Sequence, residues 1–168
     1  MKVLVRFLAV LSCIVIFSTH AQARGQAYEE TYHIGLAAGN IDGGTDFGGT
    51  VEATGFMIAA RNKKASLEYV NMSSKDGDIL GGGIWEAKLS GFYLALIGQG
   101  QPYMKFKVGK LKHEMIQTIG AALPDSETES VTSYGLGFGY KMGSRAMIEF
   151  DITTLDQDMT LFTLTVLF

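Results

Sequence analysis

The sequence predicts an all-β fold: a closed, eight-stranded, antiparallel up-and-down β-barrel. Apolar and polar residues alternate with a period of two through most of the chain, which is the pattern of β-strands. Turn-forming residues divide this pattern into eight segments. The 168 residues are 47% hydrophobic and include 21 glycines but two prolines, and at this length one compact domain is expected.

The first 23 residues differ in kind from the rest. A positively charged start is followed by an 11-residue apolar run at 7–17, interrupted by one serine, and then by the small-residue pattern Ala21-Gln22-Ala23. These three features describe a secretory signal, and the apolar run is shorter than the ~20 residues of a membrane helix. We therefore predict that residues 1–23 are a cleaved signal peptide and that residues 24–168 form the barrel domain.

Cysteine content and charge narrow the class of protein further. The single cysteine, Cys13, lies inside the signal, and Leu11 fits a lipid-attachment pattern poorly, so we expect neither disulfides nor a lipid anchor. Lys2 and Arg6 also lie there, which leaves 12 basic against 17 acidic residues and a net charge of −5. Proteins that bind nucleic acid normally carry a basic face, so we expect no nucleic-acid partner.

The eight expected strands differ in how clearly they alternate. Their ranges are 28–39, 51–60, 65–73, 84–97, 103–115, 131–141, 145–155 and 158–168. The pattern is clearest in the last one, where threonines occupy one face and apolar residues the other. It is less clear at 84–97, where Phe92, Leu94 and Leu96 are in phase with Glu86 and Lys88. This mismatch indicates a bulge or a shifted phase in that strand.

The connections between these segments alternate in length and charge. Three are tight turns, at 61–64, 98–102 and 142–144, and the others are loops at 40–50, 74–83 and 118–130 and a short one near 155–157. Short turns on one rim and longer loops on the other are typical of bacterial transmembrane barrels. Nine acidic residues lie in or beside the loops: Asp42, Asp46, Asp76, Asp78, Asp125, Glu127, Glu129, Asp156 and Asp158. One hypothesis is that they bridge anionic lipopolysaccharide through divalent cations.

The charged residues on the face opposite the aromatic residues decide which face of the sheet lines the lumen. Eight strands enclose a lumen just wide enough for side chains, which is too little space for all the aromatic residues of the apolar face. With the aromatics in lipid, the charges lie inside, where opposite signs can pair, and a sheet exposed to lipid must close. We therefore predict a transmembrane β-barrel. The expected lumen charge network consists of Glu52, Glu68, Lys105, Lys107, Glu149 and Asp151.

Three stretches carry a family resemblance. They are Pro102 to Gly109 (PYMKFKVG), Tyr134 to Lys141 (YGLGFGYK), and the last hairpin, Arg145 to Asp151 closed by Thr163 to Phe168. In this order, behind a signal, they resemble the outer-membrane β-barrel domain family, which includes OmpA-like, OmpX-like and opacity-type proteins. The resemblance spans most of residues 28–168.

This resemblance implies a location and a set of partners. It implies export to the cell outer membrane, contact with outer-membrane lipids and lipopolysaccharide, and a monomeric barrel. It also implies that the C-terminal strand is the signal read by the barrel-assembly machinery, although these residues can equally be just a last strand. The residues of this assembly signal are Phe162, Leu164, Val166 and Phe168.

No cofactor, metal or catalytic site is predicted. Gly135, Gly137 and Gly139 alternate with aromatics within one strand, unlike a nucleotide-binding loop, and are interpreted as leaving room inside the barrel. Asp76-Gly77-Asp78 lacks the further oxygen ligands that calcium needs. His33, expected inside, and His113, expected at the outer end of its strand beside a glutamate, lie in no catalytic motif that we recognise.

We therefore expect a non-enzymatic integral outer-membrane protein that supports envelope integrity or surface interaction. Three alternatives from other classes stay open. A lipid-modifying enzyme requires a Ser–His–acid cluster at the membrane face. A narrow ion channel requires a continuous wet lumen, and a secreted soluble barrel that binds a lipophile requires an apolar lumen.

Overall fold

A computed structural model describes residues 31–44, 49–79, 82–119, 124–142, 146–155 and 159–168. All eight expected strands are present: β1 (Thr31–Asp42), β2 (Thr50–Arg61), β3 (Ala65–Ser74), β5 (Ile84–Ile97), β6 (Tyr103–Thr118), β7 (Asp125–Met142), β8 (Ala146–Thr154) and β9 (Thr160–Leu167). A two-residue strand, β4 (Gly77–Asp78), pairs with the start of β5. In these ranges no helix is long and apolar enough to cross a membrane. The predicted signal, residues 1–23, lies outside the described residues.

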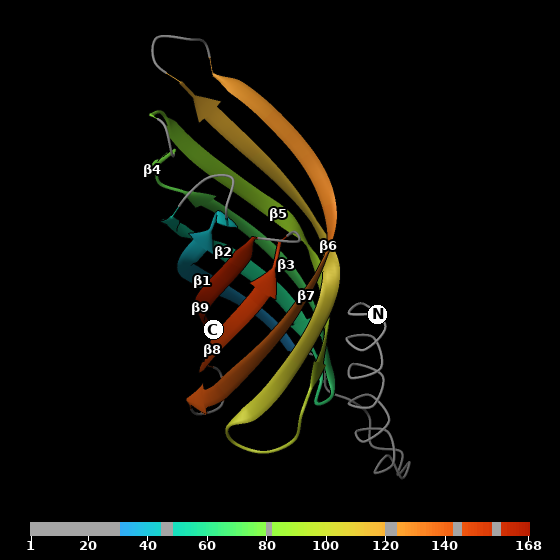
Figure 1. The fold of residues 1–168 in the computed structure, drawn as a ribbon. Helices are drawn as coiled ribbons and strands as arrows, with labels where there is room; N and C mark the ends of the chain where they lie inside the picture. Colours follow the sequence, from blue (N-terminus) through green and yellow to red (C-terminus); the bar gives the residue numbers. More distant parts are fainter. Residues whose placement is uncertain (1–30, 45–48, 80–81, 120–123, 143–145, 156–158) are drawn as a thin grey trace, which may run out of the picture.

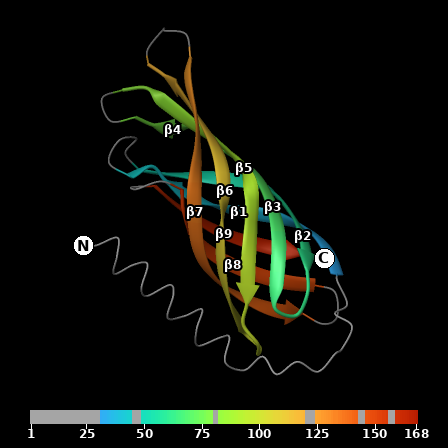
Figure 2. The same cartoon turned by 90° about the vertical axis from the view of Figure 1, so that its right-hand side faces the viewer.

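The sheet closes on itself. Each long strand pairs antiparallel with its neighbour along the chain, β3 pairs with β5, and β1 pairs with β9 at the seam. Backbone hydrogen bonds in both directions between Ile34 and Phe168, of 3.2 and 2.9 Å, continue this seam to the last residue. The predicted eight-stranded antiparallel up-and-down barrel is thus confirmed, and Figures 1 and 2 show it from two sides.

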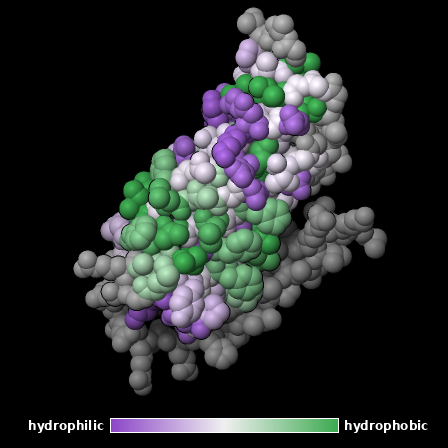
Figure 3. All heavy atoms as spheres, turned by 90° about the vertical axis from the view of Figure 1, so that its left-hand side faces the viewer, coloured by the Kyte–Doolittle hydropathy of each residue, from purple (hydrophilic) through white to green (hydrophobic). Residues whose placement is uncertain are grey.

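The exterior of the barrel is apolar around its whole circumference. Every long strand contributes large apolar side chains that are exposed to the outside, and we call this set the apolar belt. Its members include Tyr32, Ile34, Leu36, Phe56, Ile58, Leu67, Phe92, Leu94, Leu96, Met104, Tyr134, Leu136, Phe138, Tyr140, Phe150, Ile152, Phe162 and Leu164. On the face drawn in Figure 3, hydrophobic side chains gather over the lower part of the barrel and hydrophilic ones gather above them.

Strand β5 has no bulge. Its register against β6 runs without interruption from Ile84 to Ile97, and its register against β3 is also continuous. Glu86 and Lys88 therefore do face outward, in phase with Phe92. They do so at the loop end of the strand, beyond the apolar belt. The expectation of a bulge or a shifted phase in this strand is wrong.

The β6–β7 hairpin is longer than expected. Residues 118–130 were expected to form a loop, but β6 continues to Thr118 and β7 already begins at Asp125. The pair continues beyond the point where β8 ends, because β8 covers β7 only from Gly135 to Met142. As a result the two strands rise above the rest of the rim as a ribbon, which is visible at the top of Figure 1.

Candidate functional site

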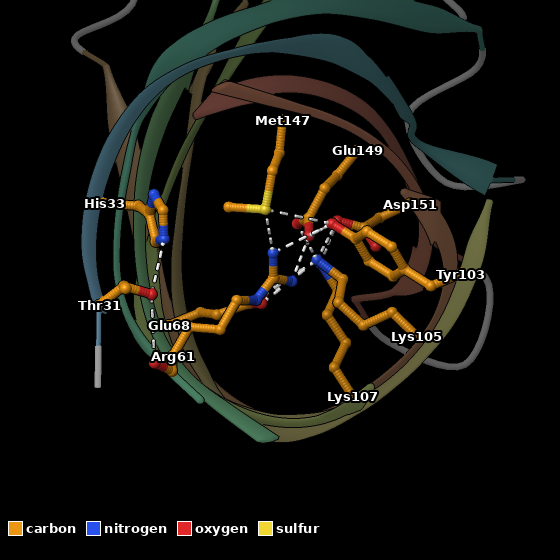
Figure 4. A network of polar contacts seen from close by, with 10 residues as sticks. All are labelled: Thr31, His33, Arg61, Glu68, Tyr103, Lys105, Lys107, Met147, Glu149 and Asp151. Atoms are coloured by element: carbon orange, nitrogen blue, oxygen red, sulfur yellow. Dashed lines mark hydrogen bonds and ion pairs between the residues drawn. The ribbon is translucent and has the colours of Figure 1, made fainter. Parts of the chain in front are cut away.

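The half of the lumen nearest the short turns holds a network of buried charges. It contains three cations and three carboxylates, each with at most 6% of its surface exposed: Arg61, Lys105, Lys107, Glu68, Glu149 and Asp151. They come from β2, β3, β6 and β8, and Figure 4 shows them pointing toward one another across the lumen. We call these six residues the lumen network; with equal numbers of each sign, it is neutral overall.

Glu149 is the centre of this network. One carboxylate oxygen, Oε1, accepts a hydrogen bond from the guanidinium of Arg61 and one of 2.6 Å from the Tyr103 hydroxyl. The other, Oε2, lies 2.5 Å from the ammonium nitrogen of Lys105. Arg61 also donates to the Tyr103 hydroxyl at 3.0 Å. Charge-assisted bonds of this kind are stronger than neutral ones, and this set ties together strands β2, β6 and β8.

The remaining members extend the network from Lys105. Its ammonium nitrogen lies 3.1 Å from Asp151 and 3.3 Å from Glu68. Asp151 in turn lies 3.1 Å from the ammonium of Lys107, which sits 4.6 Å from the centre of the Tyr93 ring. Cations are attracted to aromatic faces at this range. Every charge in the network therefore has an opposite partner, which is the condition for tolerating buried charge.

Glycines on β7 make space for these side chains. A methyl group added at Gly137 would lie 2.0 Å from a carboxylate oxygen of Asp151, and one at Gly139 would lie 2.1 Å from the ring of Tyr103. At Gly135 it would lie 2.8 Å from the side chain of Lys107. Such distances are far inside van der Waals contact. The alternating glycines therefore occupy the positions where the network leaves no room for a side chain.

One residue of the predicted network lies elsewhere. Glu52 is exposed at the loop end of β2 and pairs with Lys75 at 2.5 Å, so its assignment to the lumen is wrong. Its phase explains this: it shares the outward face with Phe56 and Ile58, while Ala53 and Met57 face inward. The structure brings together the other five: Glu68, Lys105, Lys107, Glu149 and Asp151.

Sequence reasoning missed two residues that hold the network together. Arg61 was expected in the tight turn at 61–64, yet it is 6% exposed and binds Glu149 inside the barrel. The sequence did contain a pattern that indicates an inward position, because Arg61 is in phase with the inward residues Met57 and Ala59. Tyr103 was noted as part of a family-like stretch, but nothing in its neighbours indicated that its hydroxyl would bridge Arg61 and Glu149.

The two histidines lie apart from one another. His33 is half-buried near the turn end and its Nε2 is 3.0 Å from the Thr31 hydroxyl. His113 is buried and its Nε2 lies 3.6 Å from a carboxylate oxygen of Glu129 on the ribbon. No serine hydroxyl is hydrogen-bonded to either imidazole in the described part of the chain. Within that part, no three histidine or acidic side chains are grouped closely enough to hold a metal ion.

The half of the lumen nearest the loops is filled with apolar side chains. Trp85 and Ile41 are completely buried there, among residues from every side of the barrel. We call this set the apolar plug, and it comprises Ile41, Val51, Val70, Met72, Trp85, Leu89, Leu111, Met115, Leu155, Met159 and Leu161. At the opposite end a hollow of about 340 Å³ is lined in part by Arg61, Lys63, Tyr103 and Lys141. Arg61 also belongs to the lumen network, so this hollow borders the network.

Comparison with solved structures places this fold among known proteins. The β-barrel domain of OprF from Pseudomonas aeruginosa superposes with a TM-score of 0.62, over 83% of this chain and 98% of that one, at 10% identity. The chain shares the fold of small outer-membrane β-barrels. The same comparison finds Neisserial surface protein A, with a TM-score of 0.60 over 83% of this chain and 97% of that one at 7% identity.

A third similar structure is a surface protein in complex with a small molecule. The attachment invasion locus protein Ail of Yersinia pestis, solved with the heparin analogue sucrose octasulfate, has a TM-score of 0.58, covers 84% of this chain and 97% of that one, and is 11% identical. No family model matches the chain, and no curated protein sequence is significantly similar to it. At such low identity these three barrels establish the fold.

Proposed function

We propose that this chain is a non-enzymatic integral protein of the bacterial outer membrane, with a structural role in the envelope or a role in surface interaction. The observation that carries the proposal is the inverted polarity of the barrel. The apolar belt is exposed on every long strand, while the charges of the lumen network are buried and paired. In water such a belt would expose a large contiguous apolar surface, which soluble monomers avoid.

The proposed partners of the protein follow from the apolar belt and from the loop end of the barrel. The apolar belt faces acyl chains, and the loop end faces the lipopolysaccharide layer. A single closed barrel of this kind has no free sheet edge along its belt, so we propose that it is a monomer. We also propose that Phe162, Leu164, Val166 and Phe168 are the assembly signal. Phe162, Leu164 and Phe168 are exposed on the outer face of the closing strand, where another protein is able to contact them before the seam forms.

Cell fractionation tests the location directly. We expect the full chain, produced in a Gram-negative host, to be recovered with the outer membrane. On a detergent gel it should migrate differently before and after boiling, because a closed barrel resists detergent until heated. A chain without Phe168 should fold less efficiently into the membrane and accumulate in the periplasm. Recovery of the intact chain as a soluble protein would contradict the proposal.

The apolar plug argues against the ion-channel alternative. A conducting pore needs continuous water, and Trp85, Leu89 and Leu111 form an interior layer of packed, buried apolar side chains. We therefore expect purified protein in a planar bilayer to show no conductance steps above those of the bilayer alone. Reproducible steps that depend on protein concentration would favour a channel and would require the plug to move.

A further inference from the structure

We propose that the outer wall formed by β5, β6 and β7 binds the phosphate groups of a lipid in the outer leaflet, through Lys88, Lys110 and Lys112. This inference rests on the proposed membrane location and goes further by naming a site. The three strands lie side by side in Figure 2. We call the three residues the lysine site.

All three lysines point away from the lumen. Each is exposed, whereas their chain neighbours Leu89 and Leu111 are buried inside the barrel. In the β5–β6 register Ser90 is opposite Lys112 and Phe92 is opposite Lys110. Lys88 and Lys112 are therefore diagonal neighbours on the same face, a relation in which long side chains reach one another. The site is a compact group of cations on one wall.

The height of the site matches the edge of a membrane. Lys112 is nine positions beyond Tyr103, and Lys88 is nine positions before Ile97, counted from the turn end. At about 3.4 Å per residue and a strand tilt of about 40°, this corresponds to a height of about 23 Å, close to the ~25 Å of an apolar band. Lys110 is two positions lower, and its flexible stem allows the ammonium to reach the same level.

Within the part of the chain that the structure describes, Lys88, Lys110 and Lys112 form no ion pair. Among the described residues every lysine or arginine ion pair involves Arg61, Lys75, Lys105 or Lys107. Glu114 is opposite Lys88 in the register and Glu86 lies one step nearer the loops, but neither pairs with a lysine. Three unpaired cations grouped in this way attract an anion from outside the chain.

The surroundings suit the headgroup and the chains of one lipid. On β7, Ser130 is opposite Lys112 and Thr132 is opposite Lys110, and both are exposed, so hydroxyl donors adjoin the ammonium groups. Phe92 of the apolar belt lies beside Lys110, and Tyr134 lies one outward position nearer the turn end. Ammonium groups and hydroxyls bind phosphate oxygens, and acyl chains attached to that phosphate would lie against the belt. A phosphorylated lipid can contact both the lysine site and the apolar belt, whereas a soluble anion can contact the lysine site alone.

A matched pair of triple variants tests the site. One variant carries Lys88→Gln, Lys110→Gln and Lys112→Gln. The control carries Lys63→Gln, Lys64→Gln and Lys141→Gln, which removes the same charge from exposed residues at the turn end, away from the site. Each protein is inserted into phosphatidylcholine vesicles that contain a small fraction of bisphosphorylated lipid A, or the same lipid with its phosphates removed. After extraction in mild detergent, native mass spectrometry measures the lipid that stays bound.

The expected result is selective loss at the lysine site. Unchanged protein and the control should retain the phosphorylated lipid, and the lysine-site variant should retain it at least about tenfold less. Equal retention by all three inserted proteins, equal retention of the dephosphorylated lipid, or complete displacement by millimolar inorganic phosphate would each overturn the lipid site. Failure of all three proteins to insert would instead overturn the proposed membrane location on which the site depends.

Discussion

Replacing Glu149 with Leu should lower the free energy of unfolding by about 3–5 kcal/mol, the usual cost of removing one partner from a buried ion pair. Glu149 accepts from Arg61, Tyr103 and Lys105 at once. Its loss leaves three buried cations facing two carboxylates. Urea titration of the protein in phospholipid vesicles, followed by the fluorescence of its single tryptophan, measures the change.

Two further variants show that charge is the cause. Thr165 is the cross-strand partner of Glu149 and is equally buried, so Thr165→Val is a matched control and should cost about 1 kcal/mol or less. Adding Lys105→Met to Glu149→Leu removes the excess charge and should recover part of the lost stability. If Glu149→Leu is no worse than Thr165→Val, the lumen network does not stabilise the barrel.

Replacing Phe138 with Arg should cost about 2–4 kcal/mol of stability in vesicles, the penalty for a cation at mid-membrane depth on the lipid face of a barrel. Phe138 is 55% exposed, is paired with Phe150 across β7 and β8, and lies at the middle of the outward apolar residues of β7. A charge there must lose its hydration, because nearby outward neighbours offer no partner. The same vesicle titration measures the effect.

Depth provides the control for this substitution. Met142 lies on the same strand and the same outward face, but at the turn end, where the belt meets water. Met142→Arg should therefore cost about 0–1 kcal/mol. Equal losses at the two positions, or no loss at Phe138, would mean that this face does not contact hydrocarbon.

The fold could be predicted from the sequence because alternation survives wherever one face is uniformly apolar. In β9, Phe162 and Leu164 face outward while Thr163 and Thr165 face inward, and nothing disturbs that phase. In β5 the outward face changes from apolar to charged near Ser90, and this change resembled a shift in phase. A membrane edge produces the same signature, because the solvent of the outer face changes from lipid to water along one strand.

The lumen network could be predicted in part. Lys105, Lys107, Glu149 and Asp151 alternate with apolar neighbours, so their inward direction is evident in the sequence. Glu52 was assigned to the lumen by its charge and Arg61 to the tight turn at 61–64, although the phase of β2 places Glu52 outside and Arg61 inside. Which lysine meets which carboxylate depends on the stagger between strands, and no local pattern encodes it.

The length of the β6–β7 ribbon could not be predicted from the sequence, for a different reason. Residues 125–130 read DSETES, a polar and charged run typical of loops, and in the structure they are exposed strand. Their order comes from pairing with β6, where Glu127 is opposite Met115 and Glu129 is opposite His113. Where both faces of a strand are exposed, hydrophobic alternation disappears, and only the partner strand reveals the structure.

The three glycines of β7 also determine how the lumen of this barrel could be redesigned. At the turn end, the side chains of Tyr103, Lys107 and Asp151 fill the lumen. They occupy the space left by the missing side chains of Gly135, Gly137 and Gly139. Widening that end means trimming those bulky occupants while the glycines stay untouched. A larger residue at any of the three glycines would clash with the side chain that faces it. A natural relative with a larger residue at one of these positions should therefore carry a smaller residue at the facing position.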